Sequence, residues 1–323
     1  MALAAWWNGI VARLSDSGAA APDPRATIPP PPANGSLLSL AEMRQLTRTD
    51  LENAARIRCQ AVQVDPWTVL CRVLGRFKFL VDGRDIALAP HLMLDGYWEM
   101  WCTEYMLAHI RPGMVVIDVG ANLGYFSVLL ADLVGPDGRV VAVEPNPRMA
   151  QLTERNLALN GFWHTARVER IAVGATSGEA LAFRFVASDP KNGRVVKAGG
   201  VLPDDGDTAE IAVTGMRLDD LVAGPVDFIK IDVEGAEEQA WGGLTRLLDA
   251  SPDITVLMEF NALRCRTPEA TLADIATRFP LRELRLGGDV QLVTPAEIME
   301  QREDTLLILS RQAPTPTPAQ NKG

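Results

Sequence analysis

From Pro112 onward, the sequence alternates short apolar runs with longer segments of helical periodicity. This alternation is typical of a parallel β-sheet that is covered by helices on both faces. The pattern therefore predicts an α/β protein with a doubly wound sheet. The runs that we interpret as its strands are 114–119, 139–144, 168–173, 226–231, 254–259, 281–286 and 305–309.

Composition and charge exclude several classes of protein. Of the 323 residues, 47% are hydrophobic and 22% are charged, which argues against a disordered chain. The 31 basic and 41 acidic residues give a net charge of −10, which is unsuited to a general nucleic-acid binder. No apolar run reaches the roughly 18 residues of a transmembrane helix. The four cysteines are scattered, so we expect reduced thiols, no zinc site and a cytoplasmic location.

Changes in composition divide the chain into five expected segments. Trp6 and Trp7 share one face of the first segment, which would pack on its own domain or dock on a membrane or a partner. The segments are an amphipathic helix (1–21), a proline-rich linker (22–35), a helix-plus-hairpin cap (36–95), the main domain (96–312) and a disordered tail (313–323).

An insertion is expected within the main domain at 174–216. Two apolar runs, 181–186 and 210–214, can pair as a hairpin. The glycine- and aspartate-rich stretch 189–207 between them predicts a long, mobile loop.

Residues 116–127 carry the strongest local signal, an apolar strand that leads through an Asp-x-Gly-x-x-x-Gly loop into a helix. The glycines allow a close approach to a ligand, and free N–H groups at the helix start would favour a carboxylate or phosphate. Asn122 and Tyr125 stand where the dinucleotide fingerprint requires glycines. A nicotinamide or flavin oxidoreductase is therefore disfavoured.

Two acidic residues at strand ends indicate a different nucleoside ligand. Asp118 would repel a pyrophosphate but would attract the amino group or sulfonium of S-adenosylmethionine. Glu144 ends the next strand, where a carboxylate can accept both hydroxyls of a ribose.

A second informative stretch runs from 226 to 238. Strand alternation puts Lys230 and Asp232 on one side, and Asp232 falls at the carboxyl end, where doubly wound sheets bind ligands. Lys230 is expected to pair with Asp232 or a nearby acid, either as a structural pair or facing the reacting group. Glu234 lies near a helix start, so it either complements the helix dipole or belongs to the site.

Several motifs resemble the FkbM family of S-adenosylmethionine-dependent methyltransferases. Their order and spacing, which cover about 96–262, carry the resemblance. The matching segments are 96–99, 111–113, 116–127, 143–147, 218–221, 228–237 and 258–260.

The resemblance implies a class I methyltransferase fold, which is Rossmann-like, with a seven-stranded sheet and an antiparallel last strand. It implies O-methylation of a hydroxyl on a sugar, glycan or natural product, with Asp232 as base or hydrogen-bond acceptor, Lys230 positioning it and Glu234 beside them. A non-catalytic nucleoside-binding or partner-docking protein of the same fold is the alternative. The implied cofactor-binding residues are Asp118, Gly120, Ala121, Asn122 and Gly124 for the methionine end, Glu144 for the ribose, and Ala172 and Val173 near the adenine.

A metal-dependent variant is the less favoured possibility. Asp232, Glu259 and Asn261 occupy roughly the places of the Mg²⁺ ligands in some class I O-methyltransferases. Because Phe260 separates the acid from the amide, we expect no metal.

Overall fold

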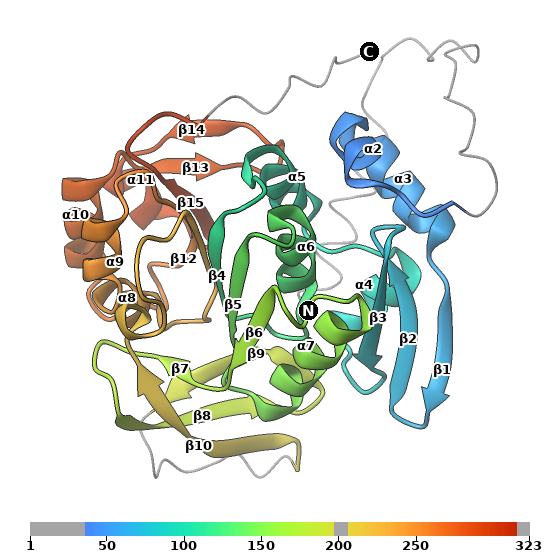
Figure 1. Ribbon diagram of the computed structural model, residues 1–323. Coiled ribbons are helices and arrows are strands. Elements are labelled where there is room, and N and C mark those ends of the chain that lie inside the picture. The colour runs from blue at the N-terminus through green and yellow to red at the C-terminus, as the bar shows by residue number, and fades with distance from the viewer. Residues whose placement is uncertain (1–35, 197–205, 315–323) are drawn as a thin grey trace, which may run out of the picture. The chain divides into compact units, whose positions relative to one another are not determined.

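Short runs rich in valine and isoleucine build the centre of the protein as a mixed β-sheet (Figure 1). The computed structural model describes residues 36–196 and 206–314. The strand order is β14-β13-β15-β12-β11-β4-β5-β6, with β12, β11, β4, β5 and β6 parallel to one another. The strands are β4 (Val115–Val119), β5 (Arg139–Val143), β6 (Ala166–Glu169), β11 (Phe228–Ile231), β12 (Thr255–Phe260), β13 (Arg282–Leu284), β14 (Val290–Leu292) and β15 (Thr305–Leu309).

The sheet has eight strands, whereas the resemblance implied seven. The additional strand, β14, was not among the predicted strands; it is three residues long and pairs with β13 as an antiparallel hairpin. The last strand, β15, is antiparallel to β12 and β13, as expected.

Helices cover both faces of this sheet, and the strands alternate between two hydrophobic cores. Val116 packs into the core under α5, α6 and α7, whereas its neighbour Ile117 packs into the core under α8 to α11. This alternation is the predicted doubly wound arrangement. The helices are α5 (Met100–His109), α6 (Tyr125–Val134), α7 (Pro147–Leu159), α8 (Glu237–Gly242), α9 (Thr245–Ala250), α10 (Pro268–Arg278) and α11 (Pro295–Glu300).

The cap joins the α5–α7 core rather than forming a core of its own, and the described residues from Leu37 onward form one compact unit. The helical part of the cap is two helices: Leu46 caps the C-terminus of the first, and Thr47 caps the N-terminus of the second. Residues 86–88 lead from the hairpin into a third helix. The cap consists of α2 (Leu40–Gln45), α3 (Arg48–Arg58), β1 (Ala61–Asp65), β2 (Thr68–Val73), β3 (Phe77–Asp82) and α4 (Ala89–Leu94).

The insertion folds as a second, four-stranded sheet in the order β7-β10-β8-β9. The predicted hairpin is present as β8 (Glu179–Val186) and β10 (Thr208–Met216), and β7 (Ala172–Val173) runs parallel to β10. The predicted mobile loop over 189–207 is wrong in its first part, because Asp189–Val196 forms β9 and pairs with β8. Residues 197–205 lie outside the described residues.

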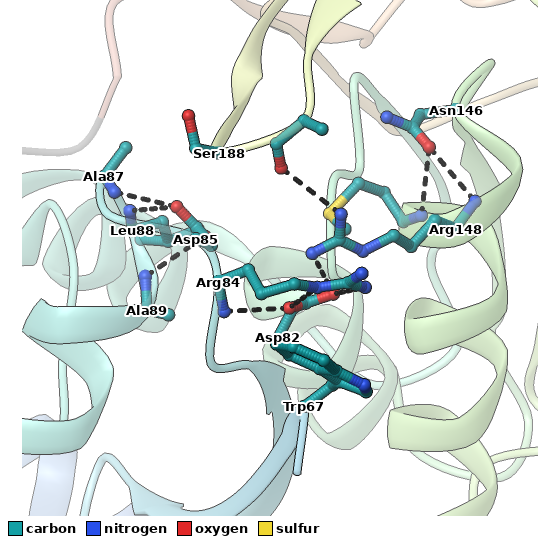
Figure 2. Close-up of polar contacts among 12 residues, drawn as sticks. Trp67, Asp82, Arg84, Asp85, Ala87, Leu88, Ala89, Asn146, Arg148 and Ser188 are labelled. Atoms are coloured by element: carbon teal, nitrogen blue, oxygen red, sulfur yellow. Dashed lines mark hydrogen bonds and ion pairs between the residues drawn. The ribbon is translucent and has the colours of Figure 1, made fainter. Parts of the chain in front are cut away.

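Polar contacts join the cap to α7 and to the insertion (Figure 2). Asp82 at the end of β3 pairs with Arg84 and with Arg148 of α7. Arg148 also donates to the carbonyl oxygen of Ala187, between β8 and β9, at 3.2 Å. Asp85 accepts the backbone N–H groups of Ala87, Leu88 and Ala89, the last of which begins α4. These contacts connect the cap, α7 and the turn between β8 and β9.

The expected N-terminal helix, linker and most of the tail lie outside the described residues. Within 36–196 and 206–314, no helix has the length and apolar character needed to cross a membrane. Cys59, Cys71, Cys102 and Cys265 are all free thiols, as expected.

Candidate active site

A cavity of about 320 Å³ lies where the loops after the parallel strands β4, β5 and β11 meet. This is the carboxyl edge of the sheet, where doubly wound folds bind ligands. The insertion and the segment before α5 also contribute to its wall. The sequence-predicted residues on the wall are Gly120, Ala121, Asn122, Glu144, Ala172, Val173, Lys230, Asp232 and Glu234.

Gly120 allows the loop after β4 to press against the chain that follows β11. Its φ is +82°, and a Cβ atom there would lie 1.8 Å from the carbonyl oxygen of Asp232. Any other residue would force the two loops apart. The glycine therefore brings the predicted cofactor loop and Asp232 to the same cavity.

The backbone N–H groups of this loop are engaged within the protein. Those of Gly120 and Ala121 donate to the carbonyl oxygen of Val143 at 2.9 and 3.0 Å, and that of Asn122 donates to Glu144 at 2.8 Å. These three loop N–H groups are therefore not available to an anionic ligand. They fix the loop to the end of β5 instead.

The Glu144 carboxylate is held rigidly at the cavity wall. Its second oxygen accepts the backbone N–H of Asn146 at 2.8 Å, and the residue is 6% exposed. Burial raises the pKa of this carboxyl to about 7, against the two N–H donors that lower it. Each oxygen keeps a further lone pair, which can accept a hydroxyl from the cavity.

Lys230 and Asp232 form an ion pair of 2.8 Å at the end of β11. The Lys230 side chain is 3% exposed, and its Nζ lies 4.9 Å from the ring centre of Phe126. Burial alone would lower the pKa of Lys230, but the carboxylates of Asp232, Asp118 and Glu99 raise it above its usual range. Lys230 is therefore a fixed positive charge that orients Asp232.

Asp118 and Gly124, by contrast, do not line the cavity. Asp118 neighbours Lys230 across the sheet, and its Oδ2 accepts a hydrogen bond from Ser127 Oγ at 2.5 Å. The residue has no exposed surface, and burial raises its pKa despite Lys230 and Ser127. Gly124 caps α6 with a φ of +91°. Asp118 and Gly124 therefore support the loop after β4 without lining the cavity.

Three carboxylates lie close together on the cavity wall. Oxygen atoms of Asp232, Glu234 and Glu259 lie within 4.8 Å of one another, close enough to share a cation. Burial first, and then the Asp232 charge, raise the pKa of Glu234 to about 7 and that of Glu259 to about 9.

Arg264 already supplies a positive charge to this cluster. Its guanidinium lies 2.7 Å from Glu234, 3.5 Å from Glu259 and 2.9 Å from Asp304. Asn261, which we considered as a metal ligand, donates its amide to Asp304 instead. We therefore assign no metal to the three carboxylates.

Sequence analysis missed four charged residues of the cavity wall: Glu99, Lys191, Arg264 and Asp304. Glu99 stands in the segment that resembles the family's lead-in helix, which was the available signal. Lys191 gave none, because β9 was interpreted as a loop. Its Nζ lies 5.1 Å from the ring centre of Trp98. His91 packs against Trp98 and does not line the cavity.

Residues 118–275 match the family model of the methyltransferase FkbM domain. The chain carries an FkbM methyltransferase domain. Its fold is the α/β class I methyltransferase-like fold, and its cofactor is S-adenosylmethionine. The matched range contains the loop after β4, Glu144, and the pair of Lys230 and Asp232.

Curated relatives of this FkbM domain are other methyltransferases. A protein-L-isoaspartate O-methyltransferase of Aeropyrum pernix is 52% identical over 52 residues, which is 16% of this chain and 20% of that protein. Methyltransferase sdnD of Sordaria araneosa is 25% identical over 167 residues, 43% of this chain and 64% of that protein. The chain spans only 20% to 29% of the length of the first three such relatives.

Among solved structures, the methyltransferase FkbM of Methylobacillus flagellatus is similar, at 18% identity and a TM-score of 0.41. The alignment covers 68% of this chain and 52% of that one.

Proposed function

We propose that this FkbM domain transfers the methyl group of S-adenosylmethionine to a hydroxyl oxygen of a sugar, glycan or natural product. The observation that carries the proposal is the single cavity that joins the loop after β4, Glu144 and the Lys230–Asp232 pair. The methyltransferase part would span 96–312, with 36–95 as its cap.

The cavity wall suits the proposed cofactor. Glu144 is a fixed double acceptor for two ribose hydroxyls, and Ala172 and Val173 offer an apolar surface to the adenine. Gly120, Ala121 and Asn122 would border the methionine end, with Asp118 and Gly124 supporting the loop behind them. When bound, S-adenosylmethionine supplies a methyl group on a positively charged sulfur.

Asp232 is the proposed hydrogen-bond acceptor for the substrate hydroxyl. Methyl transfer requires the attacking oxygen to be held about 3 Å from the methyl carbon. Lys230 fixes the Asp232 carboxylate at this point of the cavity, and Glu234 borders it on the Arg264 side. These three side chains would therefore orient the hydroxyl.

The test is a methyl-transfer screen with the full chain, methyl-labelled S-adenosylmethionine and a panel of hexoses, uronic acids and polyols. We expect label in an ether bond of at least one hydroxylated compound. Asp232→Asn should abolish this transfer and leave the affinity for S-adenosylhomocysteine near normal, and the exposed Asp253→Asn serves as its matched control. Label on nitrogen only, or full activity of Asp232→Asn, would contradict the proposal.

A further inference from the structure

Glu99 has an unusual backbone for a residue with a side chain. It precedes α5 with φ 36° and ψ 64°, in the left-handed region, which costs on the order of 1–2 kcal/mol for a residue other than glycine. Its carbonyl oxygen accepts the N–H groups of Cys102 and Thr103 at 3.0 and 3.1 Å, but its side chain does not cap the helix. The backbone therefore holds the start of α5 while the carboxyl remains available to the cavity.

The same backbone conformation recurs around the cavity. Among the described residues other than glycine, positive φ values occur at Leu74, Glu99, Asn122 and Glu234. The last three line the cavity. Strained backbone concentrated at one site is typical of a functional constraint, because the surrounding structure must maintain it.

The carboxyl groups of the cavity differ in how they are held. Asp232 is paired with Lys230, and Glu234, Glu259 and Asp304 are paired with Arg264. Glu144 accepts two backbone N–H groups.

Glu99 differs from all of these acids. Within the described residues, no cation lies at ion-pair distance from the Glu99 carboxyl and no backbone N–H bonds to it. Its hydrogen-bond partner is the Cys102 thiol, and the charges of Lys230 and Lys191 act on it from farther away. Titratable groups from several elements face the Glu99 carboxyl. They are Lys230 on β11, Asp232 just after β11, Lys191 on β9, Cys102 on α5, Tyr125 on α6 and Glu259 on β12.

We infer that Glu99 is a further catalytic residue, the base that takes the proton from the acceptor hydroxyl; this inference rests on the function proposed above. The O–H bond of the acceptor breaks, and its proton goes to a Glu99 carboxylate oxygen. The oxygen's electron pair forms the new O–CH₃ bond, and the electron pair of the broken S–CH₃ bond returns to sulfur. Glu99 then releases the proton to water.

The charges around Asp232 and Glu99 assign the two residues different roles. Asp232 orients the hydroxyl and is itself held in an ion pair with Lys230. Burial first, and then the Asp232 charge, raise the pKa of Glu99 to about 7. A general base is most effective when its pKa lies near the working pH.

The test uses two probes of the cofactor pocket, so it does not depend on knowing the acceptor. S-adenosylhomocysteine lacks the methyl group and its charge, whereas sinefungin carries an ammonium group in the place of the methyl sulfonium. A base that touches the acceptor oxygen lies within about 6 Å of the transferred methyl group, and a carboxylate at that distance attracts an ammonium group.

In the wild-type chain, we expect the preference for sinefungin over S-adenosylhomocysteine to increase as the pH rises through about 7, because Glu99 ionises. Glu99→Gln should reduce this preference by about tenfold and flatten its pH dependence. Glu99→Asp should retain part of the preference for sinefungin and part of its pH dependence. Glu154→Gln, an exposed residue of α7 that pairs with Arg170, is the matched control and should behave as wild type.

The outcomes separate the two proposals. If the wild type does not bind S-adenosylhomocysteine, the proposed function fails and the role of Glu99 fails with it. If it binds and Glu99→Gln keeps the full preference for sinefungin, only the role of Glu99 is overturned. If Glu99→Gln loses all binding, Glu99→Asp provides the test instead, since it keeps a carboxylate. A Glu99→Asp variant that binds S-adenosylhomocysteine but shows no preference for sinefungin also overturns the role of Glu99.

Discussion

Lys230 interacts with three surrounding carboxyl groups. It lies beside the carboxyl groups of Asp118, Asp232 and Glu99, and its side chain is 3% exposed. Burying a lysine without a partner is costly, so these acids and Lys230 stabilise one another. The same cluster provides the cavity with its fixed charges.

Removing this charge should be strongly destabilising. Lys230→Met would leave the surrounding carboxyl groups without their buried cation, at an expected cost of about 3–5 kcal/mol. Chemical denaturation of the apo protein measures this loss of unfolding free energy. Lys78→Met, on an exposed position of β3, is the matched control and should cost less than about 0.5 kcal/mol. Equal stability of the two variants would contradict the pairing of Lys230.

How well the site could be predicted depended on where each residue lies relative to the sheet. Glu144 and Asp232 were placed together because the carboxyl ends of parallel strands meet at one edge. Asp118 was expected on the cavity wall, but its side chain lies on the α6 side of β4, beside Ser127. Glu99 reaches the cavity from outside the sheet, so strand periodicity could not reveal it.

The cap is joined to helix α7 by two asparagines one turn apart. Asn156 is fully buried; it accepts the N–H of Leu80 at 2.7 Å and donates to the carbonyl oxygens of Leu80 and Leu123 at 3.1 and 2.8 Å. Asn160 makes the same pair of contacts with Lys78 at the exposed end of the junction. Burial is therefore the main difference between them.

This pair gives a controlled test of the junction. Asn156→Ala should destabilise the protein by about 3 kcal/mol, because it leaves buried backbone groups without partners. Asn160→Ala should cost about 1 kcal/mol or less, because water can replace its contacts with Lys78. Thermal and denaturant unfolding measure both. A cost of Asn156→Ala no greater than that of Asn160→Ala would contradict the buried junction.

Among the elements, β9 shows why local sequence was insufficient. Its residues include Pro190 and Gly193, which are unfavourable in strands, and it begins the glycine- and aspartate-rich stretch that we interpreted as a loop. In the structure, β9 is an edge strand, and Gly193 lies under the ring of Phe183, where a Cβ atom would come within 2.3 Å of the ring. Pairing with β8 therefore overrides local propensity. The parallel strands β4, β5 and β11 were predictable because each is a largely buried apolar run with several β-branched residues. The strand expected at 168–173 is instead divided between β6 and β7, and β6 is not a buried apolar run.

At the scale of the whole molecule, the acids of the cavity make stability depend on pH. The pKa values of Glu99, Glu144 and Glu234 are raised to about 7 and that of Glu259 to about 9, from the ordinary value of 4.5. These groups bind more protons in the folded chain than in the unfolded chain. Stability is therefore lost as the pH rises from about 4.5 through these values.

We expect the apo protein to unfold at a lower temperature at about pH 8.5 than at about pH 6. Replacing Glu259 by Gln should reduce the difference, because it removes the group with the highest of these pKa values. Calorimetric scans at the two pH values measure this effect. A protein that is more stable at the higher pH would contradict the burial of these acids.

The central claim is that the cavity after β4, β5 and β11 binds the cofactor through Glu144. Its most direct test is calorimetric titration of the full chain and of Glu144→Ala with S-adenosylhomocysteine. We predict a dissociation constant in about the micromolar range for the wild type, and a loss of about 2 kcal/mol, or roughly thirtyfold, for the folded variant. Failure of the folded wild-type protein to bind, or equal affinities of the two proteins, would contradict the claim.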